Sequence, residues 1–561
     1  MKQGLFKIIM LILVLGASCT KLDENILDES SITGQTDKQI ADGLIAPVYA
    51  RLPDIYRHTT LFALSEISTD EAILPYRGGT DWGDNGIYMS MHKHETISSD
   101  VNVRETWGFI TQALSRAVIA ISALPENKDA NAKVYLAEAR AMRAFYNMHL
   151  LDGWGLAFKK EKPDDFSTIL RGQEAIDYIA AELIAAEAGL ETTTGPGRLT
   201  KGAAWGLLAK LYLNAAVWRD PYAVTFTFRP DDMDKVIDYT NRVISSNNYV
   251  LSPDYFAIFG NNNNSNKELI FAVDQRWDLN GHNRLAYFSL SGDQRPLPAF
   301  PAANGTDGPG ITPEWYRTWV NAYAPRDPSE VDPRFSQKNL IVPASGADTC
   351  YTAADFKYDR GILRGQQYGI AFAAGAFLRC PDGRFRVTKL FNASRSRPTY
   401  AVDFTETINF TTAGSDYSTG FRVLKYEFST RSSTGRNAGE ADISIIRLAD
   451  VYLMRAEAKL RKGDAAGALL DVNAIRAART GSGKVAPPLT NLTTDILLRE
   501  RGFELYWEFQ RRTDLIRFGK YEDSWTEKTN NDRNKRVFPI PQTAIDGASN
   551  LTGYLVQNKG Y

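Results

Sequence analysis

The chain has 561 residues, of which 43% are apolar and 23% charged, and its formal net charge is −1. This composition is that of a folded protein with enough residues for a large core or for two or three ordinary domains. Because there is no basic excess, we predict no nucleic acid partner. After residue 18 we find no apolar run long enough to span a membrane.

The amino terminus has the pattern of a lipoprotein export signal. Two lysines precede an apolar run, and three small residues then lead to a cysteine: Lys2 and Lys7, Ile8–Leu15, Gly16-Ala17-Ser18 and Cys19. We predict a signal peptide over residues 1–18 and acylation of Cys19, with an ordinary cleaved signal peptide as the alternative. Acyl chains hold a soluble body to a membrane without spanning it. The polar, acidic residues 19–35 would then be the lipidated tether.

The first half of the body is predicted to be helical. Apolar residues recur there at three- and four-residue steps, which is the pattern of amphipathic helices. An apolar segment at Phe62–Ile67 lies between the first two of these helices. The predicted helices are Gln39–Leu52, Arg104–Leu124, Asn131–Leu151, Gln173–Leu190, 197–218 and Asp232–Ser246.

Thr69–Asn102 is rich in glycine, aspartate and aromatic residues and is predicted to be a long loop. Loops of this length in a compact domain are usually functional. His92 and His94 alternate and could share one face of a strand. No third ligand accompanies them, so ring stacking or a surface position fits these histidines better than a metal site.

From about residue 255 to 435 the sequence changes to a region dominated by Gly, Pro, Asn and aromatic residues. Strand-like runs are short there, at Glu268–Val273 and Phe421–Phe428. We therefore predict a large irregular, loop-rich insert with small strands, packed on the helical side. Trp315, Tyr316 and Trp319 have the spacing of a short helix that packs into the core.

The stretch Ile445–Gly519 organises the rest of the chain. An apolar stripe from Ile445 to Leu460 predicts one helix, and a second stripe, Ala465–Ile475, predicts the return helix. Between them, Gly463 suits a left-handed cap and Asp464 an N-cap. Such antiparallel pairs are typical of tetratricopeptide units. Pairs of helices occur mainly in residues 36–250 and 440–520, so we predict a solenoid-like scaffold that the insert interrupts.

The next predicted helix, residues 495–511, places Glu500, Glu504 and Glu508 on one row although its surface is apolar almost all round. Like charges at this spacing repel one another unless cations pair with them. Several arginines are available nearby: Arg499, Arg501, Arg511, Arg512 and Arg517. We therefore expect buried, paired carboxylates with a structural role.

Several motifs together resemble the SusD/RagB family of outer-membrane nutrient-binding lipoproteins from Bacteroidetes-type bacteria. They are A-E-A-R-A-M-R-A-F-Y at 137–146, R-L-A-D-V-Y-L-M-R-A-E-A at 447–458, E-R-G-F-E-L at 500–505, R-T-D-L-I-R-F-G at 512–519, F-P-I-P at 538–541 and Q-N-K-G-Y at 557–561. The resemblance implies a mostly α-helical fold with tetratricopeptide-like helical pairs forming one side. It also implies that residues 36–561 form a single domain.

The same resemblance implies a function and partners. The protein would face the cell exterior on the outer membrane, capture an oligosaccharide and deliver it to a SusC-like TonB-dependent transporter as that transporter's extracellular lid. A peptide cargo is the main alternative, because some relatives take up peptides. A surface glycosidase and a tetratricopeptide scaffold for protein partners are the rival classes.

Aromatic residues in loops are the candidate ligand platforms, because a sugar ring stacks its C–H bonds on an aromatic face while polar neighbours bind its hydroxyls. Trp82, with Arg77 and Asp81 beside it, has that combination. The other candidates are Trp277, Arg284, Tyr287, Arg364 and Tyr368.

Enzyme signatures are missing from the sequence: it has no Walker loop, no HExxH and no GxSxG. Asp70/Glu71 and Glu500/Glu504 are the available carboxylate pairs, and neither has the character of a glycosidase pair. We therefore predict no catalytic residues, no cofactor and no metal site. Cys350 and Cys380 could form one disulfide or remain two buried thiols.

Overall fold

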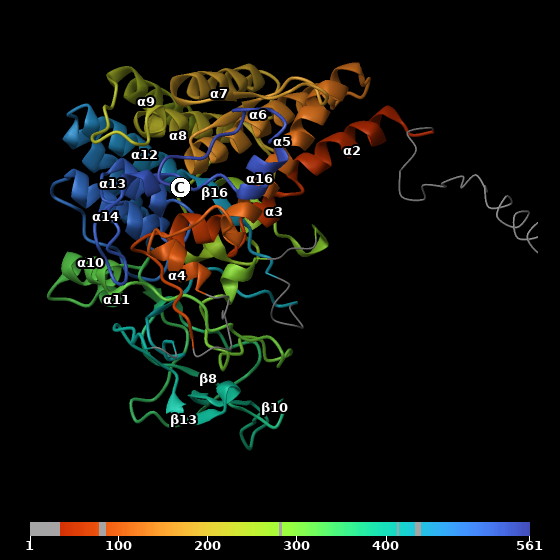
Figure 1. The fold of residues 1–561 in the computed structure, drawn as a ribbon. Coiled ribbons are helices and arrows are strands. Elements are labelled where there is room, and N and C mark those ends of the chain that lie inside the picture. Colours follow the sequence, from red (N-terminus) through yellow and green to blue (C-terminus); the bar gives the residue numbers. More distant parts are fainter. Residues whose placement is uncertain (1–33, 78–85, 280–282, 412–413, 432–438) are drawn as a thin grey trace, which may run out of the picture.

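The computed structural model describes residues 34–77, 86–279, 283–411, 414–431 and 439–561. A layer of paired helices forms one side of the molecule, and an irregular region with short strands forms the other (Figure 1). This is the predicted architecture of a mostly α-helical protein with a loop-rich insert. The predicted signal peptide, Cys19 and nearly all of the tether lie outside the described residues.

The helical layer is continuous in space although the insert divides it in the sequence. Neighbouring helices pack in the order α5, α6, α7, α8, α9, α12 and α13, so α12 lies directly against α9. The helices are α2 Asp37–Tyr49, α3 Leu52–Ile55, the π-helix η1 Ala63–Ile67, α4 Ile87–His92, α5 Val101–Ala123, α6 Ala132–Trp154, α7 Gly172–Glu187, α8 Lys201–Arg219, α9 Pro230–Ser245, α10 Pro313–Tyr323, α11 Pro328–Val331, α12 Leu448–Arg461, α13 Ala465–Ala478, α14 Thr494–Leu505, α15 Arg511–Arg517 and α16 Gln542–Gly547.

Two glycines have local structural roles in the helical layer, one at the turn between α12 and α13 and one within α8. Gly463 has a φ of +87°, and the Asp464 carboxylate accepts a hydrogen bond from Gly467 N at 2.8 Å, as the sequence predicts for this turn. Within α8, Gly206 allows the helix to approach the last strand, because a Cβ there would lie 3.0 Å from Ile446 Cγ2.

Two buried antiparallel strands close the base of the insert. β3 (Leu269–Val273) lies near the start of the insert and pairs with β16 (Ile443–Arg447), which follows the insert, with Ile443 opposite Val273. β3 confirms the first predicted strand. The helix predicted from Ile445 begins only at Leu448, because Ile443–Arg447 pairs as a strand. The run Phe421–Phe428 forms a strand only at Arg422–Leu424.

The sheets formed by the described residues are small, and most of them belong to the insert. Two have three strands, in the orders β5-β11-β8 and β15-β6-β4, and the others are two-stranded. The remaining strands are β1 Ala157–Lys159, β2 Thr168–Leu170, β4 Ser336–Gln337, β5 Thr349–Tyr351, β6 Arg360–Leu363, β7 Gly365–Gln366, β8 Tyr368–Ile370, β9 Phe372–Ala373, β10 Ala376–Phe377, β11 Phe385–Lys389, β12 Phe391–Asn392, β13 Arg397–Ala401, β14 Asp403–Phe404 and β15 Arg422–Leu424.

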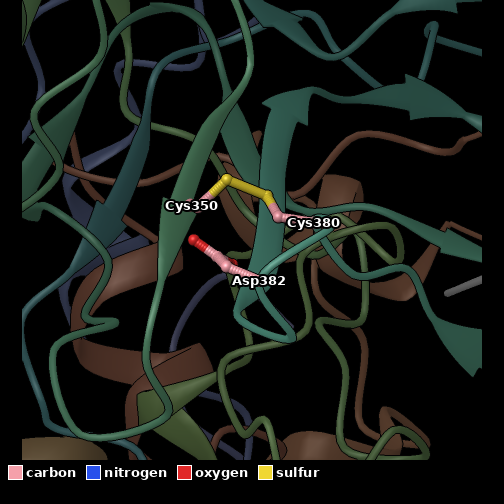
Figure 2. A group of neighbouring side chains, drawn as sticks. All are labelled: Cys350, Cys380 and Asp382. Carbon is pink, nitrogen blue, oxygen red and sulfur yellow. A yellow bond between two sulfur atoms is a disulfide. The ribbon is translucent and has the colours of Figure 1, made fainter.

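A disulfide between Cys350 and Cys380 cross-links the outer part of the insert, with a Cα–Cα distance of 6.2 Å (Figure 2). This settles the alternative that the sequence leaves open. Asp382 lies beside the two cysteines. Because both sulfur atoms are bonded to each other, these three residues do not form a thiolate metal site.

A buried ion network joins the insert to the helical layer. Glu500, Glu504 and Glu508 are each at most 2% exposed, which confirms the predicted buried carboxylates. Burial alone would raise the pKa of Glu504, but Arg479, Arg447 and Arg334 outweigh it and hold that pKa well below its usual value. Arg447 Nη1 lies 2.7 Å from Glu504, and Lys425 Nζ lies 2.6 Å from Glu508.

The cations of this network are mostly not the arginines that the sequence suggests. Arg334 and Lys425 come from the insert, and Arg447, Arg476 and Arg479 come from the part of the chain that follows it. Of the predicted partners, only Arg499 reaches the row, at 3.4 Å from Glu500. The other four pair elsewhere: Arg501 with Asp450 and Asp514, Arg511 with Asp70, Arg512 with Asp152 and Arg517 with Glu457.

The predicted helix over 495–511 is wrong in its last third. α14 ends at Leu505, and Trp507 and Phe509 have left-handed φ values of +57° and +62°. Backbone N–H groups of this turn donate to two buried carboxylates, Trp507 N to Glu71 and Gln510 N to Glu66. Those bonds offset the cost of the unusual conformation. Glu508 therefore reaches the network from a turn and not from a helical row.

Among the described residues, one helix, Val101–Glu126, is long and apolar enough to cross a membrane by length and composition. Half of the most apolar 18-residue stretch of this helix is buried, and the helix packs against α2 and α6. This is the position of a core helix in the helical layer.

Candidate functional site

The sequence-predicted loop at 69–102 is only partly a loop. Trp82 and Asp81 lie outside the described residues. The segment that follows includes the helix α4, which the sequence does not predict. His92 ends that helix and His94 follows it, so they do not alternate on a strand. Both are buried, and His94 stacks on Tyr521 with ring centroids 4.2 Å apart, which confirms the ring-stacking interpretation for His94.

Arg77 is buried in the interior and does not face solvent. Its guanidinium donates to three backbone carbonyls: Nη1 to Asp416 O at 2.6 Å, Nη2 to Thr419 O at 3.1 Å and Nε to Gly308 O at 3.3 Å. Burial lowers its pKa to about 10. The prediction that Arg77 contacts a ligand is therefore corrected, because its donors hold the backbone of the 416–419 loop.

The loop held by Arg77 carries a surface with exposed aromatic rings and charged groups. Arg397 donates through both Nη atoms to Asp416 Oδ1 at 3.1 Å, and Asn409 Nδ2 donates to Asp416 Oδ2 at 3.0 Å. The Arg397 guanidinium lies 4.0 Å from the centre of the Tyr400 ring, which is 55% exposed.

Two further exposed aromatic residues are connected to this group, one as a chain neighbour of Asn409 and one through a backbone hydrogen bond. Phe410 follows Asn409 and is exposed, and the exposed Tyr76 accepts a hydrogen bond from Ser415 N at its carbonyl, at 2.6 Å. We call this surface the 397–416 patch; it comprises Tyr76, Arg397, Tyr400, Asn409, Phe410 and Asp416. Its rings offer stacking faces, and its carboxylate, guanidinium and amide offer acceptors and donors for hydroxyl groups.

Trp277 is the sequence candidate with the most accessible ring among those described. It lies on η5 (Trp277–Leu279), shortly after β3, and is 44% exposed. The neighbouring Arg276 pairs with Asp274, Nη2 to Oδ2 at 2.8 Å. A pocket of about 700 Å³ lies beside Asp274, Arg276 and Leu279 and extends to α2.

The remaining candidates have structural contacts. Tyr287 is 2% exposed, and the centre of its ring lies 5.3 Å from that of Phe428. The Arg284 guanidinium lies over the Tyr287 ring, 5.8 Å from the ring centre. Tyr368 lies half-buried on β8 opposite Lys389 of β11. The structure therefore does not gather these residues with Trp277 into one exposed aromatic site.

Arg364 links α10 and α11. Its Nη1 donates to Tyr316 Oη and to Asp327, each at 2.9 Å. The hydrogen bonds from Arg364 lower the pKa of Asp327 to about 2. Trp315, Tyr316 and Trp319 form the buried face of α10, as their spacing predicts.

The two carboxylate pairs considered for glycosidase chemistry are also structural. Asp70 forms a two-pronged pair with Arg511, Oδ1 to Nε at 2.7 Å and Oδ2 to Nη2 at 2.6 Å. Glu71 is buried beneath it. Glu500 and Glu504 are both buried in the ion network. Neither pair presents two carboxyl groups to a substrate.

The sequence contains only a weak signal for the 397–416 patch. Arg397 and Tyr400 are close in the sequence, but Asp416 and Asn409 are separated from them by a connection without a regular pattern. The contact with Tyr76 spans more than 300 residues. Such groupings arise from the packing of loops on the fold and not from local periodicity.

Three comparisons relate the chain to known proteins. The model of the SusD family matches residues 330–561. The starch-binding protein SusD of Bacteroides thetaiotaomicron is 27% identical over 90% of this chain and 86% of its own length. A SusD-like protein of Formosa agariphila is 23% identical over 82% of this chain and 80% of its own length.

Solved structures share the fold. A SusD superfamily protein from Parabacteroides distasonis has a TM-score of 0.66 at 18% identity and covers 94% of this chain and 100% of that one. A laminarin-binding SusD-like protein has a TM-score of 0.63 at 19% identity with the same coverage. Surface glycan-binding protein A from Bacteroides thetaiotaomicron, in complex with laminarihexaose, has a TM-score of 0.60 at 20% identity and covers 93% of this chain and 100% of that one.

Proposed function

We propose that this chain, whose residues 330–561 match the model of the SusD family, is a glycan-binding protein of the bacterial cell surface that takes up nutrients and performs no chemistry on them. The observation that carries the proposal is the 397–416 patch, where exposed Tyr400 lies against the Arg397–Asp416 pair. The names of its relatives, which include binders of starch and laminarin, support a glycan ligand. Tyr400 would stack on a sugar ring while Asp416, Asn409 and Arg397 bind its hydroxyls.

The proposed ligand contact Asp416 is held in place by residues around and below it. Asp416 Oδ1 and Oδ2 are held by Arg397 and Asn409, which fixes the carboxylate plane before any ligand arrives. Below it, Arg77 fixes the backbone of the same loop. A rigid, pre-oriented contact loses less entropy on binding, which favours affinity for a flexible chain such as an oligosaccharide. Trp277 and Trp82 remain proposed additional platforms.

We further propose that residues 36–561 form one domain, tethered through acylated Cys19 to the outer membrane and facing the exterior. Its partner would be a SusC-like TonB-dependent transporter, on whose extracellular mouth it acts as a lid. Cys19→Ala should abolish incorporation of a labelled fatty acid and release the protein from the membrane fraction. Continued labelling of the variant would contradict the lipoprotein assignment.

Isothermal titration of purified residues 20–561 tests the ligand class. Starch, laminarin and xyloglucan oligosaccharides and a set of neutral peptides are titrated in parallel, and the same samples are assayed for reducing ends. We expect saturable binding of at least one saccharide without hydrolysis. Binding of peptides alone would replace the glycan by a peptide cargo, and release of reducing ends would establish a glycosidase.

A further inference from the structure

A concave site lies within the insert. It is a pocket of about 750 Å³, within the range of about 300–1,000 Å³ that is usual for small-molecule sites. Its walls come from four segments that are far apart in the sequence: 254–266, 296–300, 337–360 and 424–430. None of the six residues of the 397–416 patch lines it. The pocket is therefore separate from the proposed glycan surface.

The charges in the walls of this pocket balance. Asp254 and Glu427 contribute two carboxylates, and Lys357 and Arg360 contribute two cations, so the lining has no formal net charge. Burial lowers the pKa of Arg360, and the carboxylates of Glu427 and Asp254 oppose that shift. A pocket with this balance does not favour phosphate esters or polyanions over uncharged molecules.

Two buried polar groups in the lining lack partners. Arg360 donates through Nη1 to Phe256 O at 2.9 Å and through Nη2 to Phe259 O at 3.1 Å, but its Nε has no acceptor. Asn261 donates through Nδ2 to Phe428 O at 2.9 Å, which fixes the amide orientation and leaves Oδ1 without a donor. An unpaired buried donor or acceptor costs about 1–3 kcal/mol.

Neither of these two atoms is open to solvent, so neither reaches a molecule in the pocket. The ligand class is therefore decided by the accessible part of the lining, where side-chain amides can both donate to and accept from sugar hydroxyl groups. It combines side-chain amides with a partly exposed ring and prolines: Asn262, Asn266, Gln337, Asn339, Phe300, Pro296 and Pro298.

We propose that this pocket is a second saccharide site, which takes one or two units of a neutral sugar chain and binds their hydroxyls through the side-chain amides of its lining, Asn262, Asn266, Gln337 and Asn339. The inference rests on the proposed function for the class of its ligand. A chain bound at two separate sites has a higher effective affinity than at either one, because the second contact is intramolecular. The pocket would thus recognise part of a long glycan or a second chain.

Filling the pocket from its rim tests the proposal without disturbing the core. Ala354 is exposed on the rim, so Ala354→Trp should occlude the pocket, and Ala257→Trp does the same from another wall if the first variant folds poorly. Ala347→Trp, at an exposed alanine outside the lining, is the matched control. Each variant is also combined with Tyr400→Ala, which weakens the patch alone.

Maltose, laminaribiose, maltohexaose and laminarihexaose are titrated by calorimetry and followed by saturation-transfer NMR. In the Tyr400→Ala background we expect residual binding of a disaccharide that Ala354→Trp weakens at least tenfold and Ala347→Trp leaves unchanged. Equal binding with and without the pocket-filling tryptophan, or occupation by water only in crystals soaked with a disaccharide, would overturn the second site while the proposed function stands. If the unmodified protein binds none of the saccharides in the broader panel, the proposed function itself fails.

Discussion

The ion network around Glu504 and the 397–416 patch are built from the same residue types and serve different purposes. In the network, Glu504 is fully buried and its partners Arg447 and Arg479 are equally inaccessible. In the patch, the side chains of Asp416 and Arg397 are 49% and 30% exposed, and Tyr400 is 55% exposed. In both, an arginine pairs with a carboxylate beside an aromatic ring. Burial decides which arrangement holds the fold together and which is free to meet a ligand.

The difference has an energetic consequence. Removing one member of a buried ion pair leaves an uncompensated charge in the interior, whereas an exposed pair contributes little to stability because water screens it. Substitutions in the network should therefore change the free energy of unfolding, and substitutions in the patch should change the free energy of binding.

The largest effect is expected for Glu504→Ala. Its loss leaves Arg479, Arg447 and Arg334 partly unpaired, so the free energy of unfolding should fall by about 3–5 kcal/mol. Urea unfolding measures that change, and Glu126→Ala, at an exposed glutamate, is the control. Saccharide affinity of the folded fraction should remain unchanged. A variant of normal stability that no longer binds would place α14 in the ligand site and contradict the assignment of the network to stability alone.

Arg77 should combine both effects, because it is a buried residue that supports an exposed loop. Arg77→Ala leaves three backbone carbonyls without their donor, and we expect a loss of about 3 kcal/mol in stability. Saccharide affinity should fall as well, since Asp416 loses the anchor of its backbone. Thermal unfolding and calorimetry measure the two quantities, with the exposed Arg317→Ala as control. Unchanged stability would mean that the loop does not depend on Arg77.

Buried carboxylates next to the network predict a pH effect. Burial raises the pKa of Glu71 from 4.5 to about 7, which Arg511 opposes, and burial and the negative charge of Glu71 raise the pKa of Glu66 as well. A carboxyl with a raised folded-state pKa contributes stability at low pH that is lost as the pH rises through that pKa. The stability that Glu71 contributes should therefore decline between about pH 4.5 and 7. The contribution of Glu66, whose pKa is also raised, should decline with rising pH in the same way.

Glu71→Gln keeps the shape of the side chain and removes its titration. The stability of the variant relative to the unmodified protein should rise by about 1–3 kcal/mol between pH 5 and pH 8. Urea unfolding at both pH values measures this, and Glu126→Gln should show no such difference. A constant difference between variant and parent at the two pH values would show that Glu71 does not titrate in this range.

Tyr400→Ala should have the smallest effect. We expect saccharide binding to weaken by about 1–2 kcal/mol, the lower part of the range for interface hot spots, with little change in melting temperature. Calorimetry with the cognate saccharide and thermal unfolding distinguish this from a structural role. Phe166→Ala, at another highly exposed aromatic residue, is the control. A sharp drop in melting temperature, or unchanged saccharide affinity, would show that Tyr400 is not the stacking platform. Trp277 and Trp82 would then be the candidates, and Trp82→Ala is the corresponding variant for the second.

Periodic apolar residues in the sequence predict the helical layer and its pairing, and the Gly463–Asp464 turn is predicted down to its cap. The row of glutamates predicts buried, paired charge. These features are local, because the period of a helix and the conformation of a cap are written within a few neighbouring residues.

Only the tertiary structure decides which cations pair with those glutamates, that Ile443–Arg447 is a strand and that Arg77 points inward. Each depends on partners far along the chain: Arg334 and Lys425 for the network, β3 for the strand and the 416–419 loop for Arg77. The patch and the second pocket arise in the same way, because loops without a period are positioned by what they pack against. The sequence by itself determined the scaffold, and long-range packing decided which of its polar residues are buried and which can reach a ligand.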